Sequence, residues 1–186
     1  MSILGRALLL SLFLGLSVPA SSVAKNIPAN MSLPAPEWVI SEWINSKGFK
    51  LSELKGKVVV IDFFQLWCPG CNSFSIPLMH KWEQKYADQA KAGEIQFVSI
   101  HTVFEGHSYQ NPARLKKYLK EKGIEHPVGV DQQQKGHYVP LTMRKFNTKG
   151  TPEMAIIDKQ GRIRFQRFGS FDVAASENLI DQLLSE

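Results

Sequence analysis

The chain has 186 residues, of which 44% are hydrophobic and 21% are charged, and its formal net charge is +5. This composition is typical of one globular domain of ordinary size. Basic residues are scattered among acidic ones, so the mild positive charge gives no argument for nucleic-acid binding. The chain contains two cysteines, Cys68 and Cys71, three positions apart. This arrangement favours their use as a pair.

Residues 1–24 have the pattern of a secretory signal peptide: Arg6 supplies a positive charge, an apolar stretch follows, and small residues precede the favoured cleavage point after Ala24. The apolar stretch is short for a membrane span. We therefore expect an exported, periplasmic protein in a compartment where disulfides persist. An uncleaved leader would instead anchor the chain to the membrane. Residues 25–36 are expected to form a linker and residues 37–186 a domain.

Residues 37–44 alternate roughly between apolar and polar side chains, which predicts a first strand or short hairpin. Residues 58–64 form an apolar, β-branched and aromatic run that predicts a buried strand. After the cysteines, apolar residues recur at every fourth position and predict the buried stripe of a helix, namely Phe74, Leu78, Trp82 and Tyr86. Pro77 is expected to kink this helix. The cysteine pair therefore falls where a central strand ends and a helix begins.

The rest of the chain predicts further strands and helices: a strand at 95–100, a polar loop at 101–110, a helix at 111–122, a brief strand at 128–130, a short helix at 140–146, a hairpin of strands at 153–158 and 162–168, and a closing helix from 172. The strand, helix and strand around the cysteines imply a right-handed crossover between parallel strands. Together these elements predict an α/β fold in which helices cover both faces of a mixed sheet.

The start of a helix is a favourable place for a reactive thiolate. Unpaired backbone N–H groups and the positive end of the helix dipole would stabilise a Cys68 thiolate, lowering its pKa from about 8.5 into the range of roughly 3.5–7.5. Pro69 suits the first helical position, and Gly70 lets another backbone approach closely. Cys71, one turn into the helix, is expected to be buried. Cys68 would then attack substrate and Cys71 would resolve the mixed disulfide.

Two other uses of the cysteine pair were weighed. A structural disulfide that closes so short a loop removes little entropy from the unfolded chain. A metal site needs more ligands than one Cys-x-x-Cys motif supplies, and the sequence has no second such pair. We therefore expect no metal and no cofactor other than the redox-active disulfide itself.

From Phe49 to its end the chain resembles the thioredoxin superfamily, and most closely the exported TlpA/ResA-like disulfide reductases. The residues that carry this resemblance are Leu54 to Val60, Trp67 to Cys71, Gly150-Thr151-Pro152 with Ile157-Asp158, and Gly161, Ile163 and Gly169. The resemblance implies a thioredoxin-like three-layer α/β/α sandwich with a central mixed sheet. An insertion between 101 and 149 would separate its βαβ half from its ββα half.

The resemblance also implies roles for particular residues. A cis bond between Thr151 and Pro152 would face the cysteines, and the backbone of Thr151 would pair with a substrate strand. Trp67, Pro69 and Gly70 are expected to lie on the same substrate-binding surface.

Asp62 lies six residues before Cys68, where classical thioredoxins carry a buried aspartate and many TlpA/ResA-like proteins carry an asparagine or an apolar residue. A buried carboxyl has a raised pKa, so Asp62 would act as the general base that takes a proton from Cys71. The alternative for Asp62 is a solvent-facing residue at a strand end.

The chain departs from the cytochrome-maturation members of this family at two positions. Those members carry a glutamate three residues after the second cysteine, where this chain has Phe74, and Pro77 falls six rather than five residues after Cys71. Both departures weaken an assignment to cytochrome c maturation.

His101, after the second predicted strand, would either tune a thiolate or serve as a loop residue with a local hydrogen bond.

The expected function is an exported thiol–disulfide oxidoreductase that reduces disulfides in protein substrates, contributes to cell redox homeostasis and receives electrons from a membrane donor of the DsbD type. A copper-binding thiol chaperone would use Cys68, Cys71 and a histidine, because soft thiolates favour Cu(I). Copper chaperones of similar fold generally have a wider cysteine spacing. A thiol peroxidase of the same fold would usually carry a threonine where this chain has Gln65.

Overall fold

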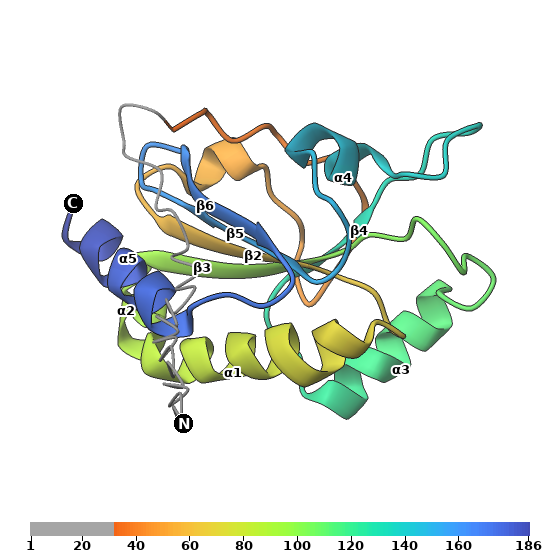
Figure 1. Cartoon of the computed structure of the whole chain (residues 1–186), viewed down its shortest axis with the longest axis horizontal. Helices are drawn as coiled ribbons and strands as arrows, with labels where there is room; N and C mark the ends of the chain where they lie inside the picture. Colours follow the sequence, from red (N-terminus) through yellow and green to blue (C-terminus); the bar gives the residue numbers. More distant parts are fainter. Residues whose placement is uncertain (1–31) are drawn as a thin grey trace, which may run out of the picture.

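A six-stranded mixed sheet runs through the middle of the computed structural model, which describes residues 32–186 (Figure 1). The strands lie in the order β1-β4-β3-β2-β5-β6, and they are β1 (Ile40–Ile44), β2 (Val58–Phe64), β3 (Ile95–His101), β4 (Val128–Asp131), β5 (Glu153–Ile157) and β6 (Ile163–Phe168). β2, β3 and β4 are parallel, whereas β1, β5 and β6 run antiparallel to their neighbours. The expected mixed sheet and parallel crossover are therefore confirmed.

Helical elements cover both faces of the sheet. They are η2 (Leu51–Leu54, a 3₁₀ turn), η3 (Cys71–Ser75, a π-helical turn), α1 (Ile76–Lys85), α2 (Ala87–Ala92), α3 (Pro112–Lys122), α4 (Leu141–Phe146) and α5 (Val173–Ser185). Figure 1 shows α1, α3 and α5 on one side of the sheet and α4 on the other. This is the three-layer thioredoxin-like sandwich that the sequence resemblance implied, with α3, β4 and α4 as the insertion.

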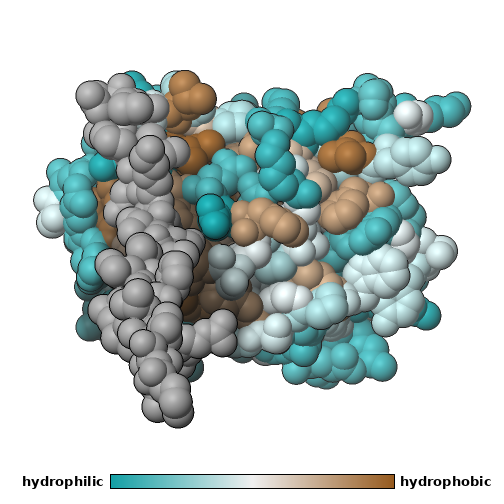
Figure 2. All heavy atoms as spheres, in the orientation of Figure 1, coloured by the Kyte–Doolittle hydropathy of each residue, from teal (hydrophilic) through white to brown (hydrophobic). Residues whose placement is uncertain are grey.

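β2 is the central strand, and all of its residues are buried. One core packs the sheet against α1 and α5 around Trp82, and a second packs it against η2, α4 and the segment before β1. Because β2 is covered on both faces, its sequence is continuously apolar apart from Asp62 rather than alternating. The face in Figure 2 is mainly hydrophilic with small hydrophobic patches, as expected when the large apolar side chains fill internal cores.

The helix after the cysteines differs from the expected one. η3 is a π turn inside a helical stretch that continues without a break into α1, and Pro77 is the second residue of α1. The helix is thus widened just before Pro77, and the kink expected there stays a prediction. Leu78, Trp82 and Tyr86 are buried as expected, and Phe74 is partly buried against the same core. Tyr86 itself lies outside the helical conformation and separates α1 from α2.

The expected signal peptide and most of the expected linker lie outside the described residues. The described end of that linker runs along the start of β6, where Ala35 N donates to Gly161 O and Ile163 N donates to Leu33 O. Within residues 32–186, no helix has the length and apolar character needed to cross a membrane.

Two glycines with left-handed backbones allow a matched stability test. Gly48 has φ of 88°, and a Cβ there would lie 2.5 Å from Cδ1 of Trp43; Gly56 has φ of 90° with nothing within 4 Å. Gly56→Ala is expected to lower the free energy of unfolding by about 1–2 kcal/mol through backbone strain alone. Gly48→Ala is expected to lose about 1–3 kcal/mol more through overpacking. Urea denaturation measures both, and equal losses would contradict a packing role for Trp43.

Candidate active site

The two cysteines lie just beyond the end of β2 and are joined by a disulfide, with their Cα atoms 5.2 Å apart. Cys68 is 7% exposed and Cys71 is fully buried at the first position of η3. Cys68 therefore lies nearer the surface and Cys71 beneath it, which is the order of burial expected from the sequence. An incoming sulfur would meet Cys68 first.

Backbone N–H groups at the helix start surround Cys68. Cys71 N donates to the Sγ of Cys68 at 3.1 Å, and Asn72 N donates to the carbonyl of Cys68 at 3.1 Å. In the reduced protein the first of these bonds would stabilise a Cys68 thiolate, as the position at the start of a helix predicts.

Asn72 joins the cysteine segment to the insertion, a role that was not predicted from the sequence. Its Nδ2 donates to the carbonyls of Leu66 (3.1 Å) and Cys68 (3.0 Å), and its Oδ1 accepts from the hydroxyl of Tyr118 on α3 (3.0 Å). Leu66 belongs to the turn that precedes the cysteine pair, and Cys68 is the first residue of the pair. Asn72 therefore fixes this turn against α3. Only the contact with Tyr118, distant in sequence, distinguishes it from an ordinary helical asparagine.

The bond between Thr151 and Pro152 is cis, as the family resemblance implied. Pro152 packs against Gly70, since a Cβ on Gly70 would lie only 2.8 Å from Cδ of Pro152. The glycine between the cysteines is therefore needed for a close approach, and the group that approaches is the ring of Pro152. This contact brings the cysteine pair and Thr151-Pro152 together.

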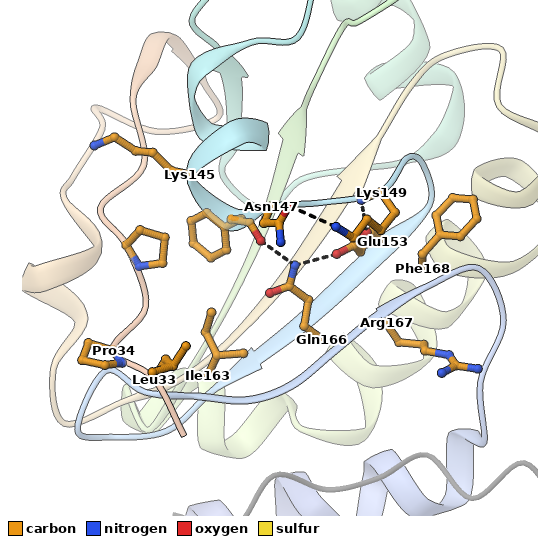
Figure 3. Close-up of a pocket in the computed structure, with 12 residues that line it drawn as sticks. Leu33, Pro34, Lys145, Asn147, Lys149, Glu153, Ile163, Gln166, Arg167 and Phe168 are labelled. Atoms are coloured by element: carbon orange, nitrogen blue, oxygen red, sulfur yellow. Dashed lines mark hydrogen bonds between the residues drawn. The ribbon is translucent and has the colours of Figure 1, made fainter. Parts of the chain in front are cut away.

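A buried carboxylate anchors the chain on both sides of this proline. Glu153 Oε2 accepts from the backbone N of Lys149 at 2.6 Å, and Oε1 accepts from Nε2 of Gln166 at 2.6 Å. The same Gln166 amide also donates to the carbonyl of Phe146 at 2.8 Å. Figure 3 shows these side chains in a groove of about 770 Å³ beside β6. The bonds fix the segment from α4 to β5 against β6.

A shallow depression of about 500 Å³ opens beside Cys68. The residues that line it are Gln65, Trp67, Cys68, Pro69, Phe104, Glu105, Lys149, Gly150, Thr151 and Phe168. Trp67 is 49% exposed and Phe168 is 50% exposed, so both present large apolar surfaces to solvent. The structure thus brings Trp67, Pro69 and Thr151 to one surface, as expected. Phe104 and Phe168, from distant segments, were not identified from the sequence.

Asp62 lies on β2 with no exposed surface. The hydroxyl of Ser75 donates to its Oδ2 at 3.1 Å, and Oδ1 has no hydrogen-bond partner among the described residues. Burial raises the pKa of the carboxyl to about 7, although the bond from Ser75 opposes the rise. A solvent-facing Asp62, the alternative considered from the sequence, is therefore wrong. At neutral pH this group can both accept and release a proton.

His101 belongs to β3 and is buried, so its expected place in a loop is wrong, although its ring does form a hydrogen bond within the following segment. Its Nε2 lies 3.2 Å from Oε1 of Gln110, which also accepts from the backbone N of Leu66. Burial lowers the pKa of His101 to about 4, so the ring is neutral at pH 7 and cannot stabilise a thiolate by its charge. Across residues 32–186, no three His, Cys, Asp or Glu side chains cluster as a metal site.

The raised pKa of Asp62 predicts a pH-dependent effect on stability. The unfolded carboxyl ionises near 3.8 and the folded one near 7, so folding loses stability as pH rises between these values. Asp62→Asn is therefore expected to raise the free energy of unfolding by roughly 2–4 kcal/mol at about pH 8 and to change it little at about pH 4. Urea denaturation of the oxidised protein at both pH values tests this. A gain of equal size at both would show that charge burial is not its cause.

Comparison with known proteins places these features in a family. The family model described as Redoxin matches residues 33–184. Protein DipZ from Mycobacterium tuberculosis is 31% identical over 153 residues, which is 79% of this chain and 20% of DipZ. The chain therefore spans about a fifth of the length of DipZ. The thiol-disulfide oxidoreductase ResA of Bacillus anthracis is 24% identical over 135 residues, covering 73% of this chain and 68% of ResA.

Solved structures agree with this result. The thioredoxin-like superfamily protein SPOA0173 is 38% identical with a TM-score of 0.78, and the alignment covers 83% of this chain and 98% of that one. A thiol-disulfide isomerase from Corynebacterium glutamicum is 37% identical with a TM-score of 0.76, with coverage of 82% and 97%. These matches and the geometry of the cysteine pair confirm the resemblance seen in the sequence. The chain therefore belongs to the Redoxin family and, within the thioredoxin superfamily, to the TlpA/ResA-like thiol–disulfide oxidoreductases.

Proposed function

We propose that this protein reduces disulfide bonds in exported protein substrates through its Cys68–Cys71 pair. The observation that carries the proposal is the arrangement of the pair at a helix start. Cys68 lies at the edge of an open depression with a backbone N–H on its sulfur, and Cys71 is buried below it. Such an arrangement favours a nucleophilic first thiol and a protected second thiol.

The reaction would run in two exchange steps. The Cys68 thiolate attacks one sulfur of the substrate disulfide, whose S–S bond breaks as a mixed disulfide forms and one substrate thiol leaves. Asp62 then takes the proton of Cys71, and the Cys71 thiolate attacks Sγ of Cys68. The second substrate thiol leaves, so the substrate gains two electrons and the enzyme pair becomes a disulfide.

The depression beside Cys68 would hold the substrate polypeptide. An extended segment would pair with the backbone of Thr151, which lines the depression, and so bring its cysteine to Cys68. Trp67 and Phe168 would contact apolar side chains that flank this cysteine. The indole of Trp67 is held at one edge, because its Nε1 donates to Oε1 of Gln65 at 2.7 Å and its six-membered ring lies against Gly106.

The location and the electron supply follow from the sequence and from the direction of the reaction. The leader-like residues 1–24 support export. A reductase in an oxidising compartment is itself left oxidised after each turnover, so it needs a donor, and a membrane protein of the DsbD type is the candidate. Phe74 stands where the cytochrome-maturation members carry a glutamate, which does not favour apocytochrome c as the substrate.

Substitution of each cysteine separates the two steps. Cys68→Ser is expected to abolish reduction of a protein disulfide because no nucleophile remains at the surface. Cys71→Ser is expected to complete the first step and accumulate a covalent mixed disulfide, visible by mass spectrometry under non-reducing conditions. Each variant is the control for the other. Reductase activity that survives Cys68→Ser would refute the proposed mechanism.

The direction of the reaction is tested by the reduction potential of the cysteine pair. We expect a value near that of thioredoxin, about −270 mV, because a reductant must hold its electrons weakly relative to its substrates. Equilibration with dithiol and glutathione buffers, followed by alkylation of free thiols, gives the value. A potential near that of DsbA, about −120 mV, would make the protein an oxidant and overturn the proposed direction.

A further inference from the structure

The turn that follows Cys71 contains one residue more than an α-helical turn. Ile76 N donates to the carbonyl of Cys71, five residues back, which is the bond of a π helix. This extra residue agrees with the late position of Pro77, six residues after Cys71. Cys71 and Ser75 begin and end the turn, and both are fully buried. The two side chains therefore share one buried face of the helix, about one turn apart.

Ser75 uses this position to contact the buried carboxyl of β2. Its hydroxyl lies 3.1 Å from Oδ2 of Asp62, and neither residue has exposed surface. An ionised carboxylate has only acceptor atoms, so the hydroxyl must donate. Among residues 32–186, Oδ1 of the same carboxyl receives no hydrogen bond. One oxygen of Asp62 is thus occupied and the other is available.

We propose that Ser75 is a positioning residue for thiol–disulfide exchange: its hydroxyl holds Oδ2 of Asp62 and leaves Oδ1 to accept the proton of Cys71. The inference rests on the proposed function, because it concerns the second step of that reaction. The proton passes from Sγ of Cys71 to Oδ1 of Asp62. The Cys71 sulfur then bonds to Sγ of Cys68 while the bond from Cys68 to substrate breaks. The departing substrate thiolate takes up a proton from Asp62 or from solvent.

The electrostatic surroundings make this hydrogen bond important. Burial raises the pKa of Asp62, and the bond from Ser75 favours the ionised form and opposes the rise. Without the hydroxyl, the carboxyl would remain protonated at neutral pH and could not accept a proton from Cys71. Ser75 would therefore set the pH range in which the second step proceeds.

Other titratable groups near Asp62 are poorly placed or unsuited to replace this bond. Tyr118 on α3 has its pKa raised to about 12, mainly by burial and also by the charge of Asp62, so it is neutral, and its hydroxyl donates to Asn72. His101 on β3 is neutral at pH 7. On the same strand, Ser99 is paired in register with Asp62, and its hydroxyl contacts Nε2 of His126 at 2.7 Å.

His126 in turn bonds to Glu83 on α1 through Nδ1 at 2.8 Å. On the other side of Asp62, the β5 residue paired in register with it is Met154, which does not titrate. Among the described residues, the hydroxyl of Ser75, at the end of η3, is thus the side-chain group that donates a hydrogen bond to Asp62. Cys71 is the titratable group on the same helix face.

The test follows the second exchange step as a function of pH. Reduced full-length protein is mixed with dithiobis(nitrobenzoate), whose two coloured thiols leave in turn as Cys68 and then Cys71 react. Ser75→Ala is expected to move the pH midpoint of the second phase upward by about one unit, since charge-assisted hydrogen bonds are about twice as strong as neutral ones. Ser75→Thr keeps the hydroxyl and is expected to restore the midpoint.

Ser176→Ala is the matched control, because Ser176 is a buried helical serine whose hydroxyl donates to the backbone carbonyl of Asp172 and not to a side-chain carboxylate. This control should leave the midpoint unchanged. Titration of the ¹³C-labelled Asp62 carboxyl by NMR gives a second readout, and its pKa should rise in Ser75→Ala. A general defect in folding would not raise the pKa of Asp62 in Ser75→Ala and leave it normal in Ser75→Thr.

Comparison with Asp62→Asn separates this inference from the proposed function. If Asp62→Asn removes the titration but Ser75→Ala leaves the midpoint in place, the base stands and the positioning role is wrong. If Ser75→Ala shifts the midpoint equally in the Asp62→Asn background, the hydroxyl acts elsewhere and the inference also fails. If Asp62→Asn retains the original midpoint, the assignment of the base fails, whereas reduction through Cys68 is tested independently by Cys68→Ser.

Discussion

The close contact between Gly70 and Pro152 is the constraint on which the site depends. It joins the βαβ half of the fold, which carries the cysteines, to the ββα half, which carries Thr151-Pro152. A Cβ on Gly70 would push the two halves apart beside Cys68, where the proposed substrate site lies. The bonds from Lys149 and Gln166 to the buried Glu153 hold the second half in place for this contact. The position of Cys68 is therefore supported by buried hydrogen bonds between residues that are remote from it in the sequence.

A carboxyl on the most buried strand of the sheet has an energetic cost that packing alone does not explain. Asp62 interrupts a run that is otherwise apolar, and its burial disfavours the ionised form. The cost is consistent with a group whose proton affinity must match that of a thiol near neutral pH. Burial therefore weakens the fold above neutral pH and also gives Asp62 a pKa of about 7, which is the property that the proposed general base requires.

Features with local signals could be predicted from the sequence, and features that depend on distant partners could not. The apolar run of β2, the start of the helix predicted from residue 111 and the cysteine pair each carry their signal within a few residues, and the structure has all of them. Asn72, Phe168 and Glu153 acquire their places in the site from residues far away in the chain, so no local pattern marks them. The π turn is an intermediate case. The sequence shows that Pro77 falls one residue later than usual after Cys71, but a proline predicts a break in a helix more readily than a widened turn before it. His101 was predicted to lie in a loop. In the structure it pairs with both β2 and β4, so β3 extends through it, and pairing with distant strands cannot be predicted from nearby residues.

The insertion between the two halves supports the site as well as enlarging the fold. Tyr118 on α3 holds Asn72, and Gln110, just before α3, bonds to the backbone of Leu66 and to His101. Tyr109 and Arg114 continue this support outward, because Tyr109 stacks near Trp67 and the Arg114 guanidinium lies 4.0 Å from the Tyr109 ring centroid. These contacts all reach the turn between β2 and Cys68 from one side, while Pro152 reaches the cysteine pair from the ββα half. The cysteine pair is thus held between two segments that the chain adds after β3, so changes in the insertion would alter the geometry at Cys68 without touching either sulfur.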